Sequence, residues 1–205
     1  MQIVSRRRVM EKRLPYDAKI EYLESSGTQY INTGILPSED LRTKVVQAFT
    51  GNSIAKNSSI FGSRGVGESR YWLNYDGHFE IGYGVFTRTD VAVHPNEVCT
   101  IDFNYIKNGS HYFNFNGIEY NAVGTPNTQY SIVLFGRVTE NQVPALSPQR
   151  IYKVQFIKND LLIGDLIPVR IGTTGYMYDK VSGQLFGNSG KREFILGPDV
   201  TSGNS

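Results

Sequence analysis

The sequence of 205 residues contains little of the material that metal centres, catalytic triads and membrane anchors require. Cys99 is its single cysteine, which excludes an intrachain disulfide and a cysteine-based metal site, and we expect it to be a small buried hydrophobe. The three histidines are His78, His94 and His111. A formal net charge of +2 and the lack of a long apolar run predict neither a nucleic-acid surface nor a membrane span. We therefore expect no metal, no cofactor and no nucleic-acid partner.

What the sequence does contain is typical of strands and turns. It has 21 glycines, 13 tyrosines and 11 phenylalanines against 3 methionines, and no segment of the domain shows a convincing helical period. Short alternating segments are separated by turn signals at intervals of about 8–12 residues. This pattern predicts an all-β sandwich or barrel.

The first 18 residues form a basic arm with a net charge of +3, whereas the remaining 187 residues carry −1. An apolar run of roughly 7–15 residues, which a secretory signal needs, does not follow the cations, so we expect no export signal. Two interpretations stay open: a solvated terminus, or an anchor that orders on an acidic partner surface. The residues of this predicted anchor are Arg6, Arg7, Arg8, Lys12 and Arg13.

The clearest strand pattern lies on both sides of Asn108-Gly109. A three-residue loop that ends in a left-handed Gly109 pairs Phe103 with Phe113 and Ile101 with Phe115. A two-residue loop would instead place aromatic side chains opposite polar ones, which sends part of the apolar set to the wrong face. We therefore predict the three-residue loop.

The next turn, Asn116-Gly117, predicts a two-residue type I′ loop that pairs Phe115 with Ile118 and Phe113 with Tyr120. Both turns place the same aromatic row on one face, so a three-strand antiparallel meander is predicted here.

A second hairpin is predicted over residues 70–83, around Asp76-Gly77. Its register is ambiguous, because either Trp72 or Leu73 forms a reasonable apolar pair with Ile81.

The same hairpin holds the best binding candidates. Planar rings beside short polar groups suit the C–H faces and hydroxyls of a sugar, and strand alternation turns part of the cluster outward. The alternative is that most of the rings are core and only one or two are exposed. The predicted glycan-binding residues are Tyr71, Trp72, Tyr75, Asp76, His78 and Tyr83.

Catalytic motifs are absent from the sequence: no zinc-protease, nucleophile-elbow, Walker or EF-hand spacing occurs. Sandwich glycosidases need two carboxylates facing one cleft, and no alternating E-x-D-x-E pattern is present. A glycoside hydrolase would have to combine acids from separate strands, such as Glu80 and Asp90. We expect that the protein is not an enzyme.

Two stretches carry a family resemblance. IEYLESSGTQYINTGI (residues 20–35) and RIYKVQFIKNDLLIGDLIPVRIGTTGYMYDKVSGQLFGNSGKREFILGPD (residues 150–199) resemble the opening and closing segments of concanavalin A-like, laminin-G-like jelly-roll domains. These domains occur in virion and fibre proteins of phages and prophages of gut bacteria. Where the family commonly has an Asn-Gly turn, this chain has Asn159-Asp160, which leaves a bulge or another turn type open.

The resemblance implies an antiparallel jelly-roll β-sandwich over residues 19–199, after the arm (1–18) and before a flexible tail (200–205). It also implies that the two ends of the domain lie close together, with Gln29–Ile31 near Phe194–Leu196.

For function, the resemblance implies a non-enzymatic virion protein of a phage or prophage. Such a fibre, decoration or receptor-binding component would join other virion proteins through the arm and contact a host-surface glycan. A homo-oligomer, with a trimer as the first expectation, follows by analogy alone. The alternatives are a bacterial carbohydrate-binding module or lectin, and the glycoside hydrolase described above.

Overall fold

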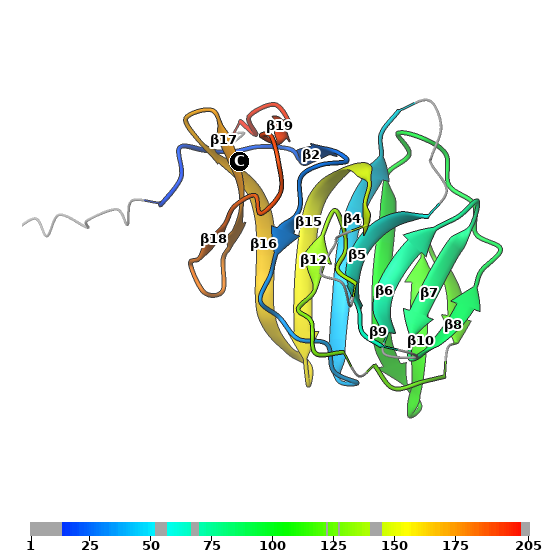
Figure 1. Cartoon of the computed structure of the whole chain (residues 1–205). Helices are drawn as coiled ribbons and strands as arrows, with labels where there is room; N and C mark the ends of the chain where they lie inside the picture. Colours follow the sequence, from blue (N-terminus) through cyan, green and yellow to red (C-terminus); the bar gives the residue numbers. More distant parts are fainter. Residues whose placement is uncertain are drawn as a thin grey trace, which may run out of the picture.

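The computed structural model describes residues 14–51, 57–66, 70–121, 123–126, 128–139 and 145–201. The predicted anchor residues Arg6, Arg7, Arg8, Lys12 and Arg13, and most of the predicted tail, therefore lie outside the described residues. Within the described ranges the chain forms an antiparallel β-sandwich of two facing sheets (Figure 1). None of these residues forms a helix, so the described chain has no apolar helix that could cross a membrane.

The larger sheet has eleven strands among the described residues, with β11-β10-β9-β4-β15-β16-β17-β18 as its main order. Three short strands lie outside this order: β1 pairs with β16, β2 pairs with β15, and β19 pairs with β2. The strands are β1 (Ala18–Lys19), β2 (Leu23–Ser26), β4 (Leu41–Phe49), β9 (Cys99–Lys107), β10 (Ser110–Phe115), β11 (Ile118–Asn121), β15 (Pro148–Lys158), β16 (Leu161–Ile171), β17 (Thr174–Asp179), β18 (Leu185–Phe186) and β19 (Ile195–Leu196).

The smaller sheet has the order β3-β12-β5-β6-β7-β8, and Figure 1 shows β5 to β8 lying over β4, β9 and β10. Its strands are β3 (Ile31–Asn32), β5 (Ser58–Arg64), β6 (Arg70–Tyr75), β7 (Phe79–Tyr83), β8 (Val85–Arg88) and β12 (Val133–Leu134). A two-stranded ribbon of β13 (Gly136–Arg137) and β14 (Ala145–Leu146) lies beside β5.

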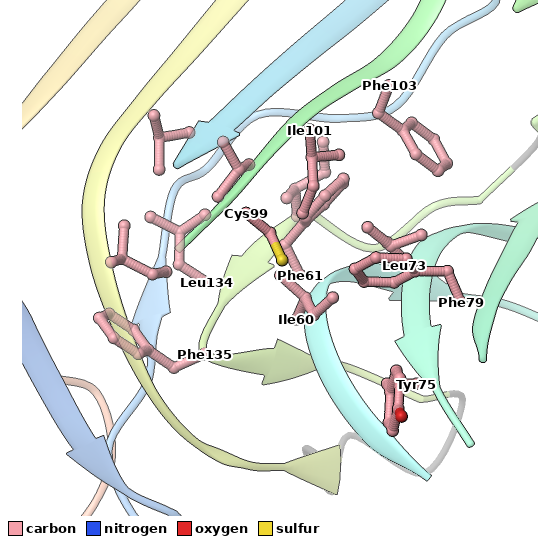
Figure 2. Close-up of a cluster of buried hydrophobic side chains, with 14 of the residues drawn as sticks. Ile60, Phe61, Leu73, Tyr75, Phe79, Cys99, Ile101, Phe103, Leu134 and Phe135 are labelled. Atoms are coloured by element: carbon pink, nitrogen blue, oxygen red, sulfur yellow. The ribbon is translucent and has the colours of Figure 1, made fainter. Parts of the chain in front are cut away.

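The core between the sheets combines aliphatic side chains with many aromatic rings (Figure 2). The rings of Phe61 and Phe103 meet edge to face at 5.2 Å, and Phe79 stacks on Phe115 at 4.7 Å. Each pair joins the smaller sheet to the larger one, so the strand alternation in both sheets places its rings in one shared interior.

Cys99 is part of this core and is 1% exposed. Burial raises the pKa of its thiol to about 11, so the group is neutral at physiological pH. The expectation of a small buried hydrophobe is confirmed.

The three-strand meander of β9, β10 and β11 pairs the aromatic residues as predicted, but the loop between β9 and β10 differs from the prediction. Phe103 lies opposite Phe113, as predicted. The loop, however, is a two-residue turn, because Lys107 pairs with Ser110 around Asn108-Gly109. The prediction of a three-residue loop is therefore wrong: the extra residue is a β-bulge further along the strand.

The bulge lies at Asn104, whose φ of 64° is in the left-handed region that asparagine tolerates. Its side-chain amide donates to the carbonyl oxygens of Glu39, at 2.9 Å, and Leu41, at 2.7 Å. These bonds hold the bulge in place. The bulge shifts the register by one residue, so the two-residue turn is compatible with the pairing of Phe103 and Phe113.

The second predicted turn is confirmed. Phe115 pairs with Ile118 and Phe113 with Tyr120 across Asn116-Gly117, which both have positive φ, as a type I′ turn requires.

The ends of the domain lie together, as expected from the resemblance. β19 pairs with β2 rather than with residues 29–31, while the Gln29 side-chain amide donates to the Glu193 carbonyl oxygen at 2.8 Å. The turn left open at Asn159-Asp160 is a two-residue turn with positive φ at both positions, since Lys158 pairs with Leu161.

Candidate functional site

The predicted aromatic cluster is divided between the two faces of the smaller sheet. The ambiguous hairpin takes the register with Leu73 opposite Ile81. Because successive side chains of a strand point to opposite faces, Tyr71 and Tyr75 join Leu73 in the core and Trp72 lies on the outer face.

The prediction that Tyr71, Tyr75 and Tyr83 bind a glycan is wrong, because all three are core residues with exposed fractions of 0%, 7% and 0%. Their hydroxyls satisfy backbone carbonyls inside the fold: Tyr71 donates to Leu41 at 2.9 Å and Tyr83 to Glu39 at 3.3 Å. Burial raises the pKa of both hydroxyls well above the usual range. These tyrosines pack the sandwich and do not face a ligand.

Asp76 and His78 lie in the hairpin turn itself. The backbone N–H of Asp76 donates to the His78 carbonyl oxygen at 3.0 Å, and Arg88 donates to the Asp76 carbonyl oxygen at 2.6 Å. The described residues that line the hollow around Trp72 include neither of them. The structure therefore does not bring these two predicted residues together with Trp72.

Trp72 is the predicted site residue that lies on the outer face. It pairs with Gly62 on one side and with Gly82 on the other. A methyl group on Gly82 would lie 2.3 Å from Cε2 of the indole, so the ring rests directly on the glycine backbone. The glycines on both sides leave room for this large flat ring to lie on the sheet.

Two further side chains complete a cluster on the indole, and we call Trp72, Phe86 and Arg137 the Trp72 platform. The Arg137 guanidinium lies 4.7 Å from the centre of the indole ring, and the Phe86 ring lies 6.1 Å from it. Trp72 is 4% exposed and forms the floor, whereas Phe86 is 48% exposed and offers an open ring. A desolvated cation over an aromatic face is a favourable contact that fixes both groups.

The platform holds two buried donors without a partner among the described residues. These are Nε1 of Trp72 and Nε of Arg137. A buried donor without a partner costs free energy, which an acceptor group of a bound ligand would recover.

A row of polar side chains crosses the same face beside the platform. Ser59 donates to Oδ1 of Asn74 at 2.8 Å, and the Asn74 amide donates to Glu80 at 3.3 Å. The three residues come from β5, β6 and β7, so the row is held by the registers of the sheet.

A hollow of about 280 Å³ opens over the platform and the polar row. Three arginines and one carboxylate are among its described lining residues, so the lining is basic. Burial and the neighbouring Arg64 lower the pKa of the Arg137 guanidinium. The lining consists of Asn57, Arg64, Arg70, Trp72, Asn74, Glu80, Phe86 and Arg137.

Sequence reasoning missed most of this lining. Arg70 and Asn74 are two residues before and after Trp72 on β6, so their side chains lie on the same face of the sheet. This alternation could have predicted both residues once the register of the hairpin was known. Phe86 lies on the next strand, opposite Gly82. Arg137 gave no local signal, because the fold brings it to Trp72 from far along the chain.

Two other hollows are less suited to a ligand. The one lined by Asp179 and Phe186 has about 530 Å³, but the Asp179 carboxylate already accepts bonds from three backbone N–H groups and the Ser182 hydroxyl. The one lined by Arg42 and Tyr105 has about 250 Å³, and its arginine is paired with Asp102. The hollow at Asp179 is larger than the hollow over Trp72, but its polar group is already occupied, so volume alone does not identify the binding site.

Among the described residues, no group of three or more histidine, cysteine, aspartate or glutamate side chains is placed to hold a metal ion.

No protein-family model matches the sequence, and no curated protein matches it. The structure is similar to the crystal structure of a Bacteroides ovatus protein described as a "putative carbohydrate binding protein", with a TM-score of 0.61 and 11% sequence identity. The similarity covers 87% of this chain and 60% of that protein, so the chain spans less than two thirds of its length. At this identity the similarity shows the fold: the chain is an all-β antiparallel sandwich, as the sequence predicted.

Proposed function

We propose that this protein is a non-enzymatic glycan-binding sandwich whose binding site is the outer face of the smaller sheet around the Trp72 platform. The observation that carries the proposal is the half-exposed Phe86 ring beside buried, unpartnered donors in one hollow. The fold shared with the Bacteroides ovatus protein, whose description names carbohydrate binding, supports it.

A sugar needs two kinds of contact from a protein. Its C–H faces pack on aromatic rings, and its hydroxyls exchange hydrogen bonds with planar amide, carboxylate and guanidinium groups. Phe86 offers the ring, and Arg137 offers a guanidinium fixed in orientation by Trp72. A site held by strand registers is already shaped before the ligand arrives, which lowers the entropy cost of binding.

The arrangement of the acids supports a binding role rather than hydrolysis. Glycosidases place two carboxyl groups about 5–9.5 Å apart across the bond that breaks. Glu80 is the one carboxylate among the described residues that line the hollow. Asp90, the other candidate acid, accepts a hydrogen bond from Tyr120 of the larger sheet.

Replacing Phe86 with alanine is expected to weaken glycan binding by about tenfold or more, because the exposed ring is lost while the fold is untouched. Val85→Ala is the matched control: this neighbour on β8 is 45% exposed but does not line the hollow. A glycan array followed by titration of the full chain measures both variants. If both variants lose affinity equally, or if the wild-type protein binds no glycan, the proposal fails.

For the setting of this activity we propose a phage or prophage particle, joined through the basic arm, with a free lectin of the bacterium as the alternative. The support is the sequence resemblance at residues 20–35 and 150–199. Removing residues 1–13 should leave glycan binding intact and abolish incorporation into particles. Equal incorporation of the shortened chain would contradict this role for the arm.

A further inference from the structure

We propose that the sugar bound at the Trp72 platform carries an acetamido group, so that the ligand is an N-acetylated hexosamine and not a plain hexose. This inference rests on the proposed glycan-binding function and names the class of sugar at the same site. An acetamido group has a carbonyl oxygen that accepts hydrogen bonds, an N–H that donates one, and a methyl group. The lining of the hollow offers a counterpart to each of the three.

The counterpart of the carbonyl oxygen is a pair of buried donors. Nε1 of Trp72 and Nε of Arg137 have no hydrogen-bond partner among the described residues, and both side chains line the hollow. The guanidinium lies 4.7 Å from the centre of the indole ring, so both donors belong to one stacked pair. An indole N–H and a guanidinium N–H donate and cannot accept. An amide carbonyl oxygen has two lone pairs with which it can satisfy them.

The counterpart of the amide N–H is the carboxylate of Glu80. This side chain is 7% exposed and lines the same hollow. Its Oε2 accepts from the Asn74 amide at 3.3 Å, whereas its Oε1 has no hydrogen bond to a described residue. A carboxylate accepts hydrogen bonds and cannot donate them, so Oε1 requires a donor from the ligand.

The charges of Glu80 and Arg137 act on each other across the hollow. Burial and the neighbouring Arg64 lower the pKa of the Arg137 guanidinium, and the negative charge of Glu80 raises it. In the part of the chain that the structure describes, no ion pair joins the two side chains. A neutral amide fits between an acceptor and a donor, because its N–H can donate to Glu80 while its carbonyl oxygen accepts from Arg137.

The counterpart of the methyl group is the ring of Phe86. This ring is 48% exposed and lies 6.1 Å from the indole. A methyl group packed on it removes apolar surface of both groups from water. A hydroxyl in the same position would place a polar atom against an apolar ring. The ring therefore favours an acetamido group over the hydroxyl that a plain hexose carries in its place.

The test titrates the full chain by calorimetry with glycans that differ only in the acetamido group: N,N'-diacetylchitobiose against cellobiose, and N-acetyllactosamine against lactose. The acetylated member of at least one pair is expected to bind about tenfold or more tightly, because the other member leaves buried polar groups without partners. Chitobiose without its acetyl groups, which has an amine in place of each amide, should lose the same factor.

Arg137→Lys keeps the positive charge but removes the Nε–H donor and the guanidinium plane. It should reduce the preference for the acetylated sugar to about twofold or less, whereas Arg170→Lys, on the exposed Asp199 pair of the larger sheet, should retain the preference of the wild-type protein. Thermal unfolding shows whether each variant is folded. The comparison of glycans uses the wild-type chain and so decides the matter even if a variant does not fold.

The outcomes separate the two proposals. Equal binding of both members of each pair, with that binding lost in Phe86→Ala, would overturn the acetamido inference and leave glycan binding at the platform standing. A preference that persists in folded Arg137→Lys would overturn it as well, as would equally tight binding of a neutral or anionic glycan without an acetamido group. Binding of no glycan at all would overturn the proposed function and this inference with it.

Discussion

Replacing Phe103 with alanine is expected to lower the free energy of unfolding by about 3–5 kcal/mol, the usual cost of emptying a large buried aromatic site. Phe103 is fully buried and its ring meets rings from both sheets. The distance between ring centres is 5.2 Å to Phe61, 5.0 Å to Tyr71 and 4.6 Å to Phe113. The substitution would leave a cavity at the point where the two layers meet.

Chemical denaturation followed by circular dichroism measures this loss. Ile106→Ala on the same strand is the control, since Ile106 is 59% exposed and its loss should change the stability by no more than about 0.5 kcal/mol. A cost below about 1 kcal/mol for Phe103→Ala would mean that the layers do not meet at this ring.

Gly82→Ala is expected to reduce glycan binding by about tenfold or more, although no ligand-contacting group is removed. The new methyl group would lie 2.3 Å from Cε2 of Trp72 and 2.6 Å from its Nε1. Since Gly82 does not have a positive φ, its backbone accepts alanine, and the indole is the part that must move. Arg137 and Phe86 would move with the ring on which they rest.

Gly175→Ala separates this effect from general strain. A methyl group there would lie 2.4 Å from Leu23 and 2.7 Å from Leu196, a clash of similar size at the other end of the sandwich. Both variants should lose about 1–3 kcal/mol of stability through overpacking, but only Gly82→Ala should lose binding. Unchanged affinity in Gly82→Ala would show that the position of the indole does not matter to the ligand.

The antiparallel layers could be predicted from the sequence because alternation limits each strand to few registers. Phe103 and Phe113 share a face only when they are paired, so this pairing was predicted correctly even though the loop was not. The bulge at Asn104 escaped prediction because a left-handed asparagine inside a strand leaves no mark on the alternation until its partners in space are known.

The site could be predicted only in part, for two physical reasons. Both registers of the second hairpin gave Ile81 an apolar partner across the strands, either Trp72 or Leu73. The sequence therefore could not decide whether Trp72 or its neighbours faced outward. Arg137 lies on a separate ribbon beside β5, and only the three-dimensional fold places it over the indole. The alternation of side chains along a strand predicts which of its residues share a face, but it does not predict which residues of another element lie against them.

The most direct test uses the fact that Trp72 is the single tryptophan of the chain, so intrinsic fluorescence reports on this site alone. The full-length protein is titrated with the best glycan from the array while the emission and its quenching by acrylamide are followed. A saturable change in emission, with the same midpoint as binding measured by calorimetry, is the result predicted here. Glycan binding that saturates by calorimetry while the emission and quenching of Trp72 stay constant would place the sugar elsewhere and contradict the account.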